Sequence, residues 1–205
     1  MLIEIIENSL QTAILLICAV ISLIRAAADR SRAWTLTFFF YGSGALGDIY
    51  WLVCLLFFGV SPQITLVSDL SWAASYIFLY LLLRQTAAPE ENGKLRLLPW
   101  IGPVFSAAAA VYFMQWGSVL SNLYPAVLMG LLSYSAIHRL MAGERFRKQR
   151  LLLVSILVLY LLEYALWISS CIWEYTPTSP YYWFDILLTV SFPIFIFGTK
   201  KAVAE

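Results

Sequence analysis

The sequence predicts an all-α membrane protein, a bundle of seven transmembrane helices. Of its 205 residues, 61% are hydrophobic and only 12% are charged, and the mean hydropathy is +0.80. Soluble domains contain roughly 45–50% apolar and about 25% charged residues, so this composition indicates a polytopic membrane protein. The apolar residues fall into seven runs of roughly 20 residues, the length that crosses a bilayer core.

Each run ends at a short turn, and no turn is long enough to hold a soluble domain. We expect helices near residues 8–26, 33–58, 62–84, 97–116, 118–141, 150–174 and 179–199. The turns fall at residues 28–31, 59–62, 88–93, 116–118, 142–144 and 176–180. Glu4 and Glu7 precede the first run where a signal peptide would be basic, so we expect a retained first helix. Pro193 is expected to bend the last helix. The whole chain, residues 1–205, forms one domain.

The basic residues predict the orientation. All of them lie in the first, third and fifth connections, at the helix ends beside these, or after the last helix: Arg25, Arg30, Arg32, Arg84, Lys94, Arg96, Arg139, Arg145, Arg147, Lys148, Arg150, Lys200 and Lys201. By the positive-inside rule the N-terminus is outside and the C-terminus cytoplasmic, which an odd number of helices satisfies. The loop from Arg145 to Arg150 is expected to contact anionic membrane lipid or a cytoplasmic signalling partner. A net charge of +1 gives no reason to expect nucleic-acid binding.

Four carboxylic acids lie inside the apolar runs, where no lysine or arginine can neutralise them. Asp48 and Asp69 belong to the second and third runs, and Glu163 and Asp185 to the sixth and seventh. An acid within a bilayer is costly and rarely lies there without facing a partner, a cavity or a substrate. At about 1.5 Å per residue, all four lie in the outer half of the membrane or near its midplane.

Aromatic residues accompany these acids at helical spacing. Three of the acids have a tryptophan three or four residues later, which places acid and indole on one helix face. Acids among indoles and phenols suit a small cationic, polyhydroxylated or lipid-derived ligand, bound in an outward-facing pocket. The predicted ligand-binding residues are Asp48, Trp51, Asp69, Trp72, Tyr76, Tyr160, Glu163, Trp167 and Asp185.

Other interpretations of these residues stay open. Each acid could be a protonated or hydrogen-bonded residue of helix packing, and tryptophans at the outer ends fit an interfacial belt. The chain could be a small proton- or cation-coupled transporter, in which Asp48 and Glu163 carry protons or coordinate a cation. A membrane-embedded hydrolase with paired carboxylates is a third alternative, but we predict no catalytic residue.

An internal repeat is suggested by the spacing of the acids. Asp69 follows Asp48 by 21 residues, and Asp185 follows Glu163 by 22 residues. Each pair flanks a short outer turn that contains Ser-Pro. This pattern fits a parallel 3+1+3 repeat, in which a linking helix joins two units of three helices.

No cofactor or metal motif is recognisable. The three cysteines, Cys18, Cys54 and Cys171, lie in apolar runs without CxxC spacing, and a single histidine, His138, excludes three-histidine zinc sites. Residues 42–47 match GxGxxG in letters, but inside a transmembrane run small residues serve close helix packing. We predict no cofactor and no metal, and a binding protein rather than an enzyme.

The segment ALGDIYWLVCLLFFGVSPQITLVSDLSWAASYIFLYLLLR resembles the multi-helix membrane sensor regions that precede diguanylate cyclase (GGDEF) domains in bacteria. SNLYPAVLMGLLSYSAI resembles their Tyr-Pro-led helix, and Glu163 with Asp185 resembles their closing acidic pair. The resemblance covers about residues 40–198 and implies a sensor in the bacterial inner membrane. Because no output domain precedes Glu205, it implies a freestanding unit whose output belongs to another protein.

Overall fold

The computed structural model describes residues 2–62, 65–86, 96–116, 119–173 and 178–203, and this part of the chain contains helices and no strand. Its helices are α1 (Leu2–Asp29), α2 (Arg32–Phe58), α3 (Leu66–Gln85), α4 (Ile101–Phe113), α5 (Val119–Leu140), α6 (Arg150–Ile172), α7 (Pro180–Ser191) and α8 (Ile194–Val203). Two short 3₁₀ helices, η1 (Leu98–Trp100) and η2 (Gly143–Gln149), precede α4 and α6. The predicted all-α fold is confirmed.

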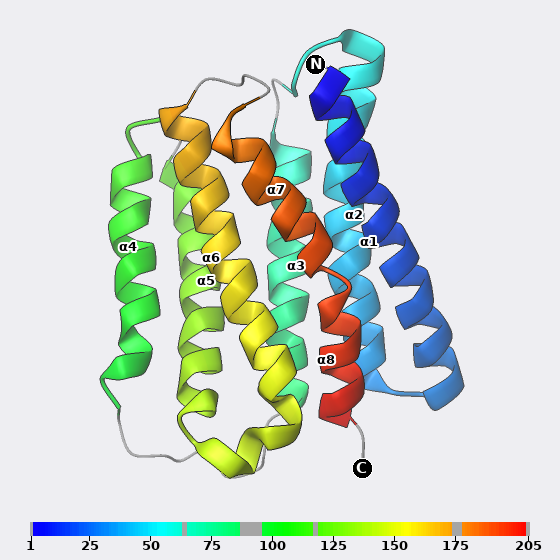
Figure 1. The fold of residues 1–205 in the computed structure, drawn as a ribbon, viewed down its shortest axis with the longest axis vertical. Helices are drawn as coiled ribbons and strands as arrows, with labels where there is room; N and C mark the ends of the chain where they lie inside the picture. Colours follow the sequence, from blue (N-terminus) through cyan, green and yellow to red (C-terminus); the bar gives the residue numbers. More distant parts are fainter. Residues whose placement is uncertain (1, 63–64, 87–95, 117–118, 174–177, 204–205) are drawn as a thin grey trace.

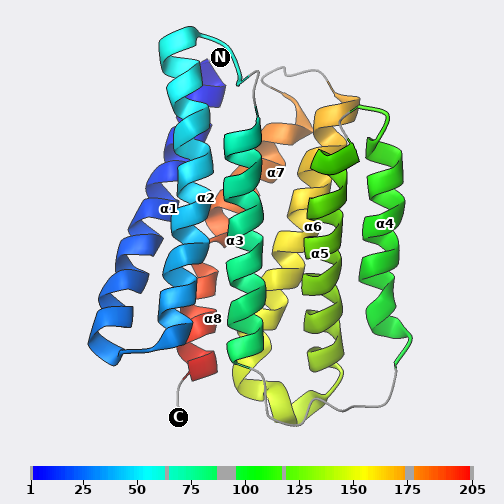
Figure 2. The ribbon, with the colours of Figure 1, turned by 180° about the vertical axis from the view of Figure 1, so that it is seen from behind.

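The helices form one bundle with two distinct ends (Figure 1). α1 packs on α2 and α2 on α3, while α4, α5 and α6 form the other side, and α3 contacts α5. Seen from behind, the same two groups meet along α3 (Figure 2). The α1–α2 and α5–α6 connections and the C-terminus lie at the end opposite the N-terminus. We call these ends the basic end and the N-terminal end, since the described lysines and arginines belong to segments at the former.

Five helical segments are long and apolar enough to cross a membrane, which supports a multi-pass membrane protein. They are α1, α2, α3, residues Phe146–Ile172, and residues Pro180–Val203. α4 with η1 forms a shorter apolar helix, and α5 carries several polar residues. The count of seven spans therefore stays a prediction.

Several helix boundaries differ from the predicted ones. α1 begins at Leu2, before the predicted residue 8, because Glu4 lies in its first turn, where the helix dipole favours an acid. α3 begins at Leu66 and not near residue 62. The predicted boundaries near residues 118 and 174 fall outside the described part of the chain.

The last predicted helix is interrupted at Pro193. α7 ends at Ser191 and α8 begins at Ile194, because proline has no N–H to donate and its ring clashes with the preceding turn. Tyr41, fully buried on α2, donates a hydrogen bond of 2.6 Å to the carbonyl oxygen of Phe192. On the other side of the break, the hydroxyls of Thr37 and Thr199 are 3.2 Å apart. α2 therefore holds the chain on both sides of the interruption.

α8 lies very close to α6 at a glycine. A Cβ atom added to Gly198 would lie 3.0 Å from Cα and 3.1 Å from the backbone nitrogen of Leu152. In the GxGxxG-like segment, a Cβ on Gly44 would make ordinary contacts with Leu15 and Ser75, and one on Gly42 would meet nothing within 4 Å. Gly198 is thus required for the distance between two helices, and Gly42 is not.

We expect Gly198→Ala to destabilise the protein, because the added methyl group meets backbone atoms that cannot rotate away. Overpacking of this kind costs about 1–3 kcal/mol. The measurement is thermal unfolding in detergent, with Gly42→Ala as the control that adds the same methyl group in open space. Equal melting temperatures for the two variants would contradict the close α6–α8 contact.

Candidate functional site

A cavity of about 320 Å³ lies among the helices at the N-terminal end of the bundle. Residues of α1 to α7 line it. They come from the beginning of α1, α3, α5 and α7 and from the end of α2, α4 and α6. These segments meet at one end because consecutive helices run in opposite directions (Figure 1).

Eight of the nine predicted ligand-binding residues line this cavity. They are Asp48, Trp51, Asp69, Trp72, Tyr76, Glu163, Trp167 and Asp185. Tyr160 is not among the lining residues. Its hydroxyl donates a 2.9 Å hydrogen bond to the carbonyl oxygen of Gly102 and lies 3.1 Å from the hydroxyl of Ser106, so it joins α6 to α4.

Asp48 is the most deeply buried of the four acids, with 3% of its surface exposed. One carboxyl oxygen, Oδ1, accepts a 3.1 Å hydrogen bond from the indole nitrogen of Trp72 on α3. The other, Oδ2, is buried and has no hydrogen-bond partner among the described residues. The ring of Trp51, which follows Asp48 by three residues on α2, lies 5.9 Å from that of Trp72. An unpaired polar atom in such a place is costly unless something satisfies it.

Gly47 allows the indole of Trp72 to reach Asp48. A Cβ atom added to Gly47 would lie 2.7 Å from Nε1 and 2.9 Å from Cδ1 of Trp72, closer than real Cβ atoms approach other atoms. Gly47 and Asp48 of α2 therefore both determine the position of the Trp72 indole. The glycine makes room for the donor, and the aspartate accepts its hydrogen bond.

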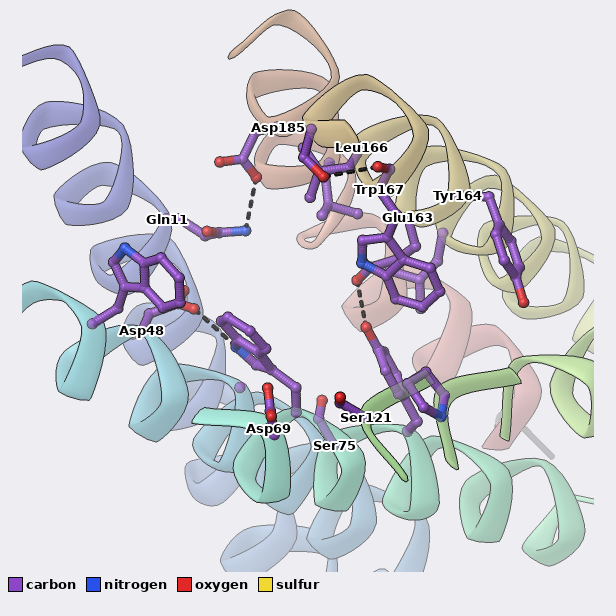
Figure 3. Close-up of a pocket in the computed structure, with 18 of the residues that line it drawn as sticks. Gln11, Asp48, Asp69, Ser75, Ser121, Glu163, Tyr164, Leu166, Trp167 and Asp185 are labelled. Carbon is purple, nitrogen blue, oxygen red and sulfur yellow. Dashed lines mark hydrogen bonds between the residues drawn. The ribbon is translucent and has the colours of Figure 1, made fainter. Parts of the chain in front are cut away.

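Glu163 lies across the cavity from Asp48 (Figure 3). It is 8% exposed, and its Oε1 accepts a 2.7 Å hydrogen bond from the hydroxyl of Tyr76. Tyr76 follows Trp72 by one helical turn on α3, so one helix supplies the donors for acids on α2 and α6. α3 thus connects the two halves of the bundle through two neutral donors.

The other two acids have weaker or more local contacts. Asp185 is 4% exposed, and its Oδ1 is 3.4 Å from the side-chain nitrogen of Gln11, a long hydrogen bond. Asp69 is half-buried in the first turn of α3, and its Oδ2 accepts a 2.8 Å hydrogen bond from the hydroxyl of Thr65. Its position also fits the preference of acids for helix N-termini.

α1 contributes lining residues that the sequence interpretation missed. Asn8 and Gln11 line the cavity, and the neighbouring Glu7 is buried with neither carboxyl oxygen hydrogen-bonded within the described chain. Glu7, Asn8, Gln11 and Thr12 are all buried on one side of an otherwise apolar helix. These residues recur at steps of three and four, which places them on one face of the helix. This spacing in the sequence could have predicted a polar face that points into the bundle.

The chemistry of the lining is acidic and aromatic. Among the described lining residues there are four carboxylic acids and no lysine, arginine or histidine. The described residues contain no group of three or more histidine, cysteine or acidic side chains arranged to hold a metal ion. The walls therefore offer hydrogen-bond acceptors, negative charge where an acid is ionised, and aromatic faces.

Comparisons with known proteins give no match for this chain. No family model, no curated protein and no solved structure is significantly similar to it. The resemblance to diguanylate-cyclase-linked sensor regions stays a prediction.

We expect Gly47→Ala to destabilise the protein by displacing Trp72 from Asp48. The change adds steric overlap and removes a hydrogen bond to a carboxyl group, effects of about 1–3 kcal/mol each. Thermal unfolding of Gly47→Ala, Trp72→Ala and the double variant measures the coupling between the two residues. In the Trp72→Ala background, Gly47→Ala should have little further effect. A loss of equal size in both backgrounds would show that the two side chains do not interact as described.

Proposed function

We propose that the protein is a receptor-like membrane sensor that binds a small organic cation in the cavity. The proposal rests on Oδ2 of Asp48, a buried acceptor without a hydrogen-bond partner among the described residues. The described residues that line the cavity around it include four acids and no basic side chain. An ammonium group supplies both a positive charge and hydrogen-bond donors to such an atom. The proposal also accommodates hydroxyl-bearing or lipid-derived molecules, provided that they carry this cation.

The aromatic lining supports a cation more than a neutral ligand. Trp51 and Trp72 line the cavity with their rings 5.9 Å apart, and Trp167 and Tyr164 line it on the side of Glu163. Indole and phenol rings attract organic cations at their faces by about 0.5–2 kcal/mol each. The cavity volume of about 320 Å³ lies at the lower end of the range for small-molecule sites, about 300–1,000 Å³.

The proposed arrangement in the membrane has seven spans, with the N-terminus outside and the C-terminus in the cytoplasm of a bacterial cell. The positive-inside rule supports it, because the described lysines and arginines belong to segments at the basic end. In that orientation the cavity faces outward. A parallel 3+1+3 repeat remains part of the proposal, with acids of both three-helix units facing the cavity.

α3 is the proposed route from the cavity to the cytoplasmic surface. Its Trp72 and Tyr76 hold Asp48 and Glu163, and its last carbonyl groups are held at the basic end. There, Arg139 of α5 donates a 2.6 Å hydrogen bond to the carbonyl oxygen of Leu83. A cation that competes for the two acids changes the contacts of α3 at one end. The loop from Arg145 to Arg150 is the proposed docking site for a signalling partner.

One observation favours a transporter as the second candidate function. The interruption between α7 and α8 lies beside the cavity, since Phe192 at the break is a lining residue. Broken helices at a central site are common in secondary transporters, where they allow one repeat to rock against the other. In this alternative, Asp48 and Glu163 bind the transported cation or the coupling proton.

Binding is tested by thermal unfolding and calorimetry with primary amines, quaternary ammonium compounds, neutral sugars and lysolipids. We expect an amine to stabilise the protein, and Asp48→Asn to weaken its binding at least tenfold, which corresponds to about 1.4 kcal/mol. Glu163→Gln should also weaken binding. The control is Asp29→Asn, an exposed acid at the basic end. Stabilisation by sugars alone, or by amines with unchanged affinity in Asp48→Asn, would refute the cation site.

Transport is tested in proteoliposomes with the amine that binds most tightly. A sensor should bind it without moving it across the membrane, whether or not a pH gradient is present. Accumulation that depends on the gradient and disappears in Asp48→Asn would instead establish the transporter. Cysteine labelling from either side of sealed vesicles, at positions 61 and 200, tests the proposed orientation in the same preparation.

A further inference from the structure

A second hollow lies on the outside of the bundle, between α2 and α3 at the basic end. It has a volume of about 530 Å³ and shares no residue with the cavity. Its lining residues come from the beginning of α2 and the end of α3: Arg32, Thr35, Leu36, Phe39, Phe78, Leu81, Arg84 and Gln85. We call it the α2–α3 groove.

The inner part of the α2–α3 groove is apolar and aromatic. The rings of Phe39 and Phe78 stack with their centres 4.9 Å apart and an angle of 22° between their planes. Phe39 and Leu81 are exposed by 43% and 42%. In a membrane, these surfaces face the acyl chains of the surrounding lipid.

The outer part of the groove carries two guanidinium groups. Arg32 begins α2 and Arg84 lies one residue before the end of α3, and both side chains are exposed. Within the described part of the chain, neither makes an ion pair or a hydrogen bond, and no acid lines the groove. Their charges are therefore available to a molecule at the membrane surface.

The depths of these two parts match the shape of a phospholipid. Phe39 follows Arg32 by seven residues and Phe78 precedes Arg84 by six, so each phenylalanine lies roughly 9–11 Å further along its helix from the basic end than its arginine. The stacking of the two rings fixes both helices at the same level. The two guanidinium groups therefore lie at the depth of the lipid head groups, and the apolar part of the groove lies at the depth of the acyl chains.

We propose that the α2–α3 groove binds one anionic phospholipid, with its phosphate between Arg32 and Arg84 and an acyl chain along Phe39 and Phe78. Guanidinium groups bind phosphate oxygens through paired charge-assisted hydrogen bonds. Basic pockets between transmembrane helices on the cytoplasmic side are suited to anionic head groups. This site is independent of the cation proposed for the cavity.

Native mass spectrometry of the detergent-solubilised full chain tests the site. The probes are phosphatidylglycerol, phosphatidylcholine with the same acyl chains, and glycerol phosphate without any chain. We expect one phosphatidylglycerol to bind, with at least tenfold weaker binding in the double variant Arg32→Gln, Arg84→Gln. Phosphatidylcholine and glycerol phosphate should bind at least tenfold more weakly than phosphatidylglycerol.

The matched control is the double variant Arg25→Gln, Arg30→Gln, which removes the same charge from exposed positions at the same end. It should bind phosphatidylglycerol like the unchanged protein. Equal losses in both double variants would show diffuse attraction of anionic lipid to the whole basic end and overturn the site. Equal binding of phosphatidylcholine, or tight binding of glycerol phosphate, would overturn the proposed lipid. Unchanged thermal unfolding of each variant verifies that it folds.

Discussion

The structure depends on hydrogen bonds to carboxylic acids that lie within apolar helices. Among the described residues, no basic side chain lines the cavity with these acids. Two neutral donors of α3 meet this requirement, the indole of Trp72 for Asp48 and the hydroxyl of Tyr76 for Glu163. An indole or a phenol satisfies only one oxygen. The acids are therefore held in place, and hydrogen-bond acceptors still line the cavity between them.

The two ends of the bundle meet different requirements. At the N-terminal end, polar and aromatic side chains from seven helices surround an open space. At the basic end, the chain closes on itself, since Arg139 bonds to Leu83, Gln149 to Thr86 and Arg96 to Met141, each through a backbone carbonyl oxygen. Arg139 is buried there against the ring of Phe146. The N-terminal end thus contains an open cavity, whereas hydrogen bonds between segments close the basic end.

Much of the fold followed from the sequence, because apolar runs and proline are local signals. The sequence predicted a bend at Pro193, where the structure has an interruption, and it predicted that acids from four helices share one cavity, which they line. The hydrogen-bond partners of the side chains could not be predicted from the sequence. Helical spacing placed Trp72 with Asp69, whereas the indole bonds to Asp48 on another helix, through a gap that Gly47 leaves. Tyr160 lies one turn from Glu163 but faces α4, because neighbours and not periodicity decide where a side chain of a buried helix points.

The interruption at Pro193 has a mechanical consequence. A continuous helix transmits a tilt along its whole length, whereas two rods joined at a proline can change their angle separately. α8 is fastened to α6 at Gly198 and to α2 at Thr199, and α7 carries Asp185 into the wall of the cavity. α7 can therefore change its angle beside the cavity, while α8 stays attached to α6 and α2 and keeps the spacing of these helices at the basic end.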